Sequence, residues 1–492
     1  MPLGIDFGTT RTIVAAVDRG NYPVLPFTDP DGDSHEFLPS VVALTDGGLV
    51  FGFEALAAAA EGAPMLRSFK RALAAPDVST ATTVSVGETE VPLLEVLTGF
   101  AEALRIAVES THGDIGTVIV GVPAHAHGAQ RFLTLEAFRT AGFRVAGLIN
   151  EPSAAGFEYT HRQGRTLNSR RTRVIIYDLG GGTFDASLVA VSGTNHEVVD
   201  TTGHNHLGGD DFDAVLASCA LRVAGRSRSD LDDAAWTALL EESREAKERL
   251  APQSRRLVLD VAGEGVVVPV ADFYEAATPL VTATVAAMEP LASGLDDVLT
   301  EVAGIYLVGG ASGLPLVPRL LRERFGRRVH RSPNPAASTA IGLAIAADDG
   351  AGFSLTDRLS RGFGVFREAA DGRYLTFDPI LGREERMAAR GTTVVRRRYR
   401  AAHNVGWFRF VEYAGIADGE PRGDIVPFAE VVFPFDHALQ QRGDVRLVPV
   451  RRTADGPLVE ETYTIDRHGM VEVRISDLES GYTHTQALSM AR

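Results

Sequence analysis

The chain has 492 residues and 45% of them are hydrophobic, which supports a substantial core and excludes a globally disordered protein. Its net charge of −16 argues against general nucleic-acid binding, and its single cysteine, Cys219, excludes an intrachain disulfide. No apolar run reaches the roughly 18 residues of a membrane span, and MPLGIDFG lacks the charged and apolar regions of a signal peptide. We therefore expect a cytoplasmic protein without nucleic-acid or membrane partners.

The basic residues are unevenly distributed in type and in place. Only two of the 48 are lysines, Lys70 and Lys247. Lysine offers a compact point charge where arginine offers a planar fork, so these positions are candidates for a specific role, with chance retention as the alternative. From Ser354 to the end, 20 basic and 20 acidic residues cancel, so the excess negative charge lies in the earlier part of the chain.

The N-terminal segment (3–17), LGIDFGTTRTIVAAV, is predicted to form a hairpin. An apolar strand carries Asp6 near its end, a turn follows at Gly8, Thr9 and Thr10, and a second apolar strand continues the chain.

Helices and buried strands alternate over the next hundred residues. In chain order we expect an alanine-rich helix over 53–61, a short helical or loop segment with Lys70, a helix over 93–110, a buried strand ending at Pro123, a helix ended by Gly142, and a strand that leads into a small-residue helix at Glu151.

The central stretch (174–191), VIIYDLGGGTFDASLVAV, repeats the N-terminal pattern. A β-branched strand carries Asp178, three glycines form a turn, and Asp185 lies just past it. We expect Gly180 to Gly182 to adopt positive φ, so that successive N–H groups point into one concavity that suits a phosphate. Taken alone, the stretch is also compatible with a tight hairpin containing structural glycines.

The similarity of the two stretches indicates two related lobes. Each lobe would provide one turn and one carboxylate, Asp6 or Asp178, on its side of a cleft. Carboxylates beside a phosphate require a cation between them, and Mg²⁺ with its waters fits that role. The repeat therefore predicts a nucleotide and its metal between the lobes.

Glycine turns also precede helices in the third part of the chain. We expect a helix with an acidic first turn within 206–216, an amphipathic helix over 236–250 that carries Lys247, a turn at Gly309 and Gly310 before a helix over 315–325, and a small-residue helix over 335–347 that can pack closely on another helix.

The sequence changes character at DDGAG (348–352), which is a plausible domain boundary. Short alternating strands follow, with turns roughly every dozen residues, and this pattern is typical of a β-sandwich. The arginine-rich run from Arg396 to Arg400 is interpreted as the solvated face of one strand, because the region is neutral overall.

Several kinds of chemistry lack support in the sequence. There is no G-x-x-x-x-G-K-[ST] motif, which excludes a P-loop enzyme, and no serine–histidine motif. The pairs His125/His127 and His204/His206 have no cysteine or carboxylate at ligand spacing, so they do not favour a metal site.

Together, these motifs resemble those of the heat-shock seventy-kilodalton (DnaK-like) chaperone family, which belongs to the actin and sugar-kinase ATPase superfamily. IDFGTT and YDLGGGTFD resemble its phosphate motifs, INEPSAA its connecting motif, VPAHAHGAQR its interdomain switch, LVGGASGLPLV its adenosine motif and YTIDRHGMVEVRISDLESG the last strands of its peptide-binding domain. The resemblance implies an α/β two-lobed actin-like ATPase domain with duplicated ribonuclease-H-like lobes (1–347), a linker (348–357) and a C-terminal antiparallel β-sandwich (358–492). We expect a short form without the family's helical lid.

The resemblance also assigns roles to residues. Asp6 and Asp178 would hold Mg²⁺ through waters, Lys70 would orient the attacking water and the γ-phosphate, and Glu151 and Asp185 would shape the water shell. The implied catalytic residues are Lys70, Glu151, Asp178, Asp185 and Thr183; the ATP-binding residues are Gly8, Thr9, Thr10, Gly180, Gly181, Gly182, Thr183, Lys247, Gly309 and Gly310; and Pro123 and Arg131 form the interdomain switch.

Some positions depart from the family pattern. Arg244, Glu248, Ala251, Gly313 and Ala336 replace, in order, a glutamate, an adenine-stacking residue, a serine, an arginine and an aspartate. These changes predict an altered adenine pocket. Gly147 replaces an arginine that the family uses for its J-domain co-chaperone, which argues against that partner, and the linker DDGAGFSLTD lacks the family's acidic, leucine-rich character.

The resemblance implies an ATP-dependent chaperone-like protein that binds ATP or ADP with Mg²⁺, hydrolyses ATP slowly, and holds unfolded or extended polypeptide with a grip that depends on the nucleotide. A nucleotide-exchange factor is a further expected partner. Two alternatives remain open: a nucleotide-gated binding or regulatory module with negligible turnover, and a small-molecule kinase of the same superfamily, for which no base aspartate can be placed.

Overall fold

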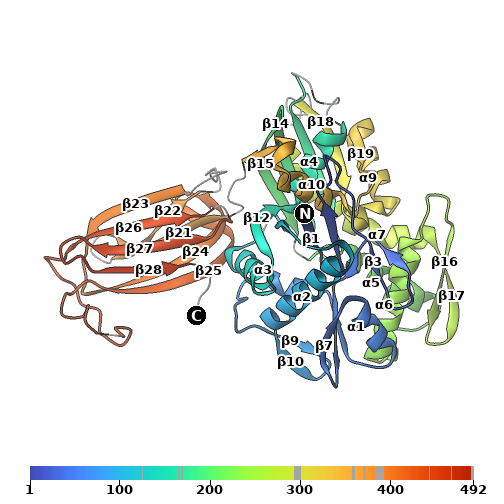
Figure 1. The fold of residues 1–492 in the computed structure, drawn as a ribbon, viewed down its shortest axis with the longest axis horizontal. Helices are drawn as coiled ribbons and strands as arrows, with labels where there is room; N and C mark the ends of the chain where they lie inside the picture. The colour runs from blue at the N-terminus through green and yellow to red at the C-terminus, as the bar shows by residue number, and fades with distance from the viewer. Residues whose placement is uncertain are drawn as a thin grey trace.

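The computed structural model describes residues 1–124, 126–163, 167, 170–204, 206–292, 301–356, 361–369, 373–382, 393–442, 444–466 and 468–488. These residues form two α/β lobes followed by a region of strands (Figure 1). None of the helices in these ranges combines the length and the hydropathy needed to cross a membrane.

The first lobe is built on a five-stranded sheet. Its strands are, in order, β12 (Arg144–Asn150), β11 (Thr117–Val122), β1 (Leu3–Phe7), β2 (Arg11–Ala16) and β5 (Leu38–Pro39). Alternate residues of β1 and β11 enter a core closed by α2 (Leu93–His112) and α3 (Gly128–Thr140). The helix predicted over 93–110 is therefore confirmed, and it is two residues longer than expected.

The second lobe is built on a six-stranded sheet. Its strands are, in order, β19 (Val329–Arg331), β18 (Val302–Val308), β13 (Arg173–Leu179), β14 (Phe184–Ser192), β15 (Asn195–His204) and β20 (Ser354–Thr356). Its core is closed by α5 (Gly209–Val223), α7 (Val270–Ala292) and α9 (Leu316–Phe325).

The two sheets repeat one connectivity. In each, a hairpin (β1–β2 or β13–β14) is antiparallel, its first strand pairs in parallel with a later strand (β11 or β18), and that strand pairs in parallel with a third (β12 or β19). The helices that follow the third strands, α4 (Glu151–Gln163) and α10 (Ser338–Ala347), pack against each other. A side chain at Gly342 would collide with the Ala154 backbone, so small residues make this close packing possible.

Smaller elements extend both lobes away from the sheets. In the first lobe these are β3 (Phe27–Thr28), β4 (Ser34–His35), β6 (Val41–Thr45), β7 (Gly48–Phe51), α1 (Gly52–Ala60), β8 (Met65–Arg67), η1 (Phe69–Ala74), β9 (Thr83–Val86) and β10 (Thr89–Pro92); in the second they are η3 (Arg228–Asp230), α6 (Asp233–Glu248), β16 (Arg256–Val261), β17 (Glu264–Pro269), η4 (Gly310–Gly313) and η5 (Gly326–Arg328), with η6 (Asp349–Ala351) after α10.

The C-terminal strands form two antiparallel four-stranded sheets that share one core, with Phe363, Phe410 and Phe433 from one sheet packed against Tyr463 and Val473 from the other. The first sheet is β22 (Tyr374–Leu381), β21 (Gly362–Ala369), β24 (Val405–Ala417) and β25 (Glu420–Pro434), and the second is β23 (Thr393–Arg400), β26 (Leu458–Ile465), β27 (Val471–Asp477) and β28 (Thr483–Ala487).

The arginine-rich run lies on β23, as interpreted from the sequence. Arg396, Arg398 and Arg400 are exposed, and the last two pair with Glu460 and Glu479. These side chains therefore form a solvated strand face.

The β-region docks on the first lobe beside α3 and β12 (Figure 1). The Gly128 N–H at the start of α3 donates to both carboxylate oxygens of Glu412, at 3.0 and 3.1 Å, and Met470 packs against the first lobe's core. Part of the segment expected to be a linker is a strand, because β20 pairs in parallel with β15; residue 357 lies outside the described residues.

Candidate functional site

The two glycine turns meet between the lobes. A Cβ atom on Gly181 would lie 2.6 Å from Thr10 Oγ1, and one on Gly182 would lie 2.8 Å from Thr9 Cγ2. None of the glycines 180–182 has positive φ, so the prediction of left-handed backbone there is wrong. Glycine is needed at 181 and 182 because the opposite turn approaches too closely for a side chain. Gly309 does adopt positive φ, at 81°.

A cavity of about 120 Å³ lies beside these turns and collects most of the predicted site residues. From the prediction, its lining includes Asp6, Gly8, Thr9, Thr10, Lys70, Glu151, Asp178, Gly180, Gly181, Thr183, Lys247, Gly309 and Gly310. Gly182 and Asp185 do not line it but lie next to residues that do. Residues distant in sequence and drawn from both lobes thus converge on one cleft.

Several carboxylates lie close together at this cleft, among them Asp6, Glu151, Asp178 and Asp185. Burial, followed by the nearby Glu151 carboxylate, raises the pKa of Asp6 well above its usual value. Burial and the Glu151 carboxylate also raise the pKa of Asp178 well above its usual value, and that of Asp185 to about 8. Such mutual repulsion among acids is relieved by a cation.

Within the described ranges, no three of the histidine, cysteine, aspartate and glutamate side chains are grouped so that they could hold a metal ion. Of the two histidine pairs, His204 and His206 belong to no such group, and His125 lies outside the described residues.

Lys70 is held rigidly at the cleft. It lies on η1, which is anchored by the buried side chains of Phe69 and Leu73. Its Nζ donates to Glu151 Oε1 at 3.0 Å and to the Phe7 carbonyl. With 6% of its surface exposed, this ammonium points into the cleft with a fixed direction.

Lys247 lies on the opposite side of the cleft, on α6. Its Nζ donates to the Gly209 carbonyl at 2.7 Å and pairs with Asp213 at 2.5 Å. The first N–H groups of α5 donate to the carbonyls of Gly180 and Gly181, at 2.9 and 2.8 Å. Lys247 thus fastens α6 to the helix start that supports the glycine turn.

The donor set fits a nucleotide triphosphate with a divalent cation. Asp185 Oδ1 has no hydrogen-bond partner among the described residues, and a side chain at Gly309 would collide with Asp178 Oδ1. The site thus combines available carboxylate oxygens, hydroxyls and an exposed glycine backbone, which are the groups that phosphate and Mg²⁺ require.

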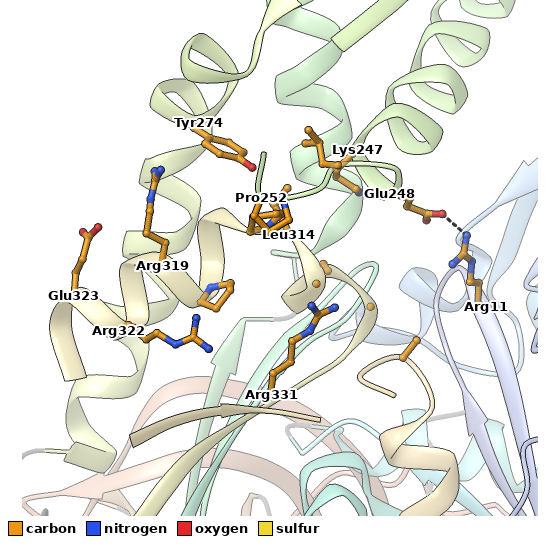
Figure 2. Close-up of a pocket in the computed structure, with 17 residues that line it drawn as sticks. Arg11, Lys247, Glu248, Pro252, Tyr274, Leu314, Arg319, Arg322, Glu323 and Arg331 are labelled. Atoms are coloured by element: carbon orange, nitrogen blue, oxygen red, sulfur yellow. Dashed lines mark hydrogen bonds and ion pairs between the residues drawn. The ribbon is translucent and has the colours of Figure 1, made fainter. Parts of the chain in front are cut away.

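A second cavity of about 960 Å³ adjoins the cleft (Figure 2). Glu248 lines this cavity, and Arg11 from the first lobe pairs with it at 2.5 Å. Arg244 pairs with Glu241, Asp210 and Asp213. Sequence reasoning missed Arg11, although its position directly after Thr10 could have marked it.

Arg131 lies at the contact with the β-region, whereas Pro123 directly precedes Ala124, which contacts a cleft acid. Arg131 Nη1 donates to Asn150 Oδ1 at 2.9 Å, and its Nε donates to the His468 carbonyl at 3.3 Å. The backbone of Ala124, next to Pro123, hydrogen-bonds the Asp185 carboxylate. Arg131 thus joins the β-region to Asn150, which directly precedes the cleft residue Glu151.

Comparison with known proteins gives consistent matches. A family model described as Hsp70 protein matches residues 2–359. Chaperone protein HscA of Klebsiella pneumoniae (strain 342) is 34% identical over 365 residues, covering 70% of this chain and 57% of that protein. Chaperone protein HscA of Escherichia fergusonii is 35% identical over 366 residues, with the same coverage. The Chaperone protein HscA homolog of Acidovorax sp. (strain JS42) is 34% identical over 374 residues, covering 71% and 58%. The chain spans a little over half the length of these relatives.

Proposed function

Because the chain belongs to the Hsp70 family, we propose that it is an ATP-dependent chaperone-like protein that binds ATP with Mg²⁺ and hydrolyses it slowly. One observation carries this proposal: two equivalent hairpin turns, one from each lobe, meet at a cavity, and each brings an aspartate, Asp6 or Asp178, to its lining. The HscA names of the relatives support the same function.

In this proposal the turns bind the phosphates. Thr9, Thr10 and Thr183 offer hydroxyls, and Gly181, Gly182 and Gly310 offer backbone N–H groups. The N–H groups of Gly180 and Gly309 donate instead to the carbonyls of Thr183 and Pro335. Asp6 and Asp178 would hold Mg²⁺ through its waters, and the ion, when bound, would neutralise phosphate charge.

The remaining residues position the attacking water. Phosphoryl transfer needs alignment and charge neutralisation more than a strong base, so a fixed ammonium is well suited to it. Lys70, held by Glu151 and the Phe7 carbonyl, would orient the water and the γ-phosphate. Asp185 would accept a hydrogen bond from that water, since its Oδ1 has no other partner among the described residues.

The β-region would bind extended polypeptide. β22 is an edge strand of its sheet, and Tyr374 and Leu375 at its start are 59% and 64% exposed. An extended peptide can add to such an edge through backbone hydrogen bonds, with apolar side chains as further contacts. The contacts of Arg131 with His468 and with Asn150, the chain neighbour of Glu151, would couple peptide binding to the nucleotide.

Two kinds of co-chaperone are relevant to this function. A nucleotide-exchange factor is a proposed partner that would act on the two lobes. The prediction against a J-domain partner gets no support from the relatives, and Gly147 lies on β12 with open space where a side chain would project.

Limited proteolysis of the full chain, with and without MgATP, tests the proposal together with single-turnover hydrolysis of labelled ATP. We expect MgATP to protect the segment around β20 and the docked β-region, and we expect slow, Mg²⁺-dependent phosphate release. Unchanged cleavage together with no bound nucleotide would overturn the proposal.

The larger cavity, which contains the Arg11–Glu248 pair, favours a second candidate function. This is a nucleotide-gated binding module with negligible turnover. The Arg11–Glu248 pair occupies the position where the family pattern expects a base-stacking side chain. Nucleotide-dependent protection without measurable phosphate release would select this candidate.

A further inference from the structure

The larger cavity has a local charge opposite to that of the chain. It is lined by Arg11, Lys247, Arg319, Arg322 and Arg331 but by only two carboxylates, Glu248 and Glu323. The chain as a whole has a net charge of −16. A basic cavity in such an acidic protein indicates selection for an anionic ligand.

Only two of the five cations are neutralised. Arg11 pairs with Glu248 at 2.5 Å, and Lys247 pairs with Asp213 at 2.5 Å. Arg319 lies over the Tyr274 ring, 5.2 Å from its centroid. In the part of the chain that the structure describes, Arg319, Arg322 and Arg331 have no carboxylate partner within ion-pair distance.

Arg322 and Arg331 line the same cavity from two different elements. Arg322 comes from α9 and Arg331 from the end of β19, and Figure 2 shows Arg322 extending into the side of the cavity on which Arg331 lies, while Glu323 extends away and the Arg331 guanidinium group lies beside Gly313. Gly313 makes room for this arrangement, because a Cβ atom there would lie 3.0 Å from Arg331 Nη2. Two cations that line one cavity and have no carboxylate partner among the described residues make an anion favourable there.

The cavity also continues into the phosphate cleft. The two cavities share six lining residues: Arg11, Lys247, Glu248, Gly310, Ala311 and Ala336. A nucleotide with its triphosphate at the glycine turns would therefore place its nucleoside in the larger cavity, near the two arginines. Two guanidinium forks match the geometry and charge of a phosphate group.

From this we infer that Arg322 and Arg331 form a phosphate-binding site next to the nucleotide. The inference rests on the proposed function for the nucleotide itself. The phosphate has two chemical sources, a second phosphate group on the ribose of the bound nucleotide or a separate phosphate ion.

Isothermal titration calorimetry of the full chain tests the inference with three probes: ATP, adenosine 3′-phosphate 5′-triphosphate, and inorganic phosphate. The proteins are the wild type, the double variant Arg322→Gln/Arg331→Gln, and Arg324→Gln as control. Arg324 lies on the same helix but is 63% exposed and pairs with Glu289. All three arginines are exposed, so these variants should fold.

A second phosphate on the nucleotide predicts that the wild type binds the 3′-phosphorylated probe about 10-fold more tightly than ATP. The double variant should lose this advantage and keep its affinity for ATP, and the control should behave as wild type. A separate ion instead predicts binding of inorganic phosphate to wild type and control but not to the double variant.

Equal affinity of wild type for ATP and the 3′-phosphorylated nucleotide, with no phosphate binding, would overturn the inference and leave ATP binding intact. Binding of phosphate without any binding of ATP would instead overturn the proposed function and leave the arginine site standing.

Discussion

Buried carboxylates occur in two regions of this molecule, and their pKa values shift in opposite directions. In the cleft, burial followed by the Glu151 carboxylate raises the pKa of Asp185 to about 8. In the β-region, burial alone would raise the pKa of Asp477, but hydrogen bonds from Ser480, Gln440 and two backbone N–H groups outweigh it and bring the pKa to about 2. Both side chains are almost completely buried.

The difference lies in the neighbours. Asp477 is surrounded by donors, which also include His437 at 3.0 Å, whereas Asp185 is surrounded by other acids and keeps one oxygen without a partner among the described residues. A carboxylate whose bonds are all made within the protein stabilises the fold. One that is left unsatisfied beside like charges costs stability, and it persists where it serves a ligand.

The largest effect on stability is expected at Glu461, a buried carboxylate whose two oxygens both accept hydrogen bonds. It is fully buried, and Arg367 donates to its two oxygens at 3.0 and 2.6 Å, with the hydroxyls of Tyr399 and Tyr463 completing its shell. Glu461→Gln removes the fully buried counter-charge of Arg367 and leaves it only Asp378, at 2.7 Å, which should cost about 3–5 kcal/mol of unfolding free energy in urea denaturation.

The matched control is Glu460→Gln, one residue earlier on β26. Its partner Arg398 is 65% exposed, so the expected cost is within about 1 kcal/mol. Equal losses for the two variants would mean that the buried network contributes no more than a surface pair.

At the cleft, Lys70→Ala should mainly affect chemistry. The variant removes the fixed ammonium at the phosphates, so single-turnover ATP hydrolysis should fall about 100- to 1,000-fold, while calorimetry should still detect nucleotide binding. Arg19→Gln, which removes an arginine that is 91% exposed on the same lobe, should turn over ATP as wild type does. Equal turnover in all three proteins would reject the assignment of Lys70.

Sequence patterns predicted the parts of the cleft that depend on local order. The repeated strand, turn and aspartate predicted two equivalent turns, and those turns do meet, with Asp6 and Asp178 lining one cavity. The hydrophobic spacing also predicted α2 and the small-residue helix α10. These features follow from periodicity and turn chemistry, which act over a few residues.

Contacts between residues that are distant in the sequence could not be predicted in this way. Gly181 and Gly182 avoid side chains because Thr10 and Thr9 of the other lobe approach them, and no local pattern encodes that distance. The Arg11–Glu248 pair joins residues from two lobes, and β20 becomes a strand only because β15 offers an edge. Sequence spacing alone does not determine such contacts.

A smaller effect is expected at Asp477. Its pKa in the folded protein, about 2, lies below the ordinary value of 3.8, so the ionised form is stabilised by folding. This contribution is complete above about pH 4 and is lost as the pH falls through 2. Asp477→Asn should cost about 1–3 kcal/mol at pH 7 in thermal or urea unfolding, and it should flatten the stability profile between pH 4 and 2. The exposed Asp455→Asn should do neither.

Of these variants, Asp185→Asn should change the free energy of unfolding least. It should raise that free energy, whereas Asp477→Asn lowers it. The folded pKa of about 8 lies above the ordinary 3.8, so without nucleotide and Mg²⁺ the stability linked to this proton is complete below about pH 4 and is lost as the pH rises through 8. The variant side chain stays neutral and can still accept a hydrogen bond from the Ala124 N–H. At pH 8 its free energy of unfolding should therefore be about 1 kcal/mol higher than that of wild type. Its ATP turnover should fall. Asp233→Asn, at a side chain that is 99% exposed, should change neither property. A variant less stable than wild type at pH 8 would place Asp185 with Asp477 among the acids that stabilise the fold.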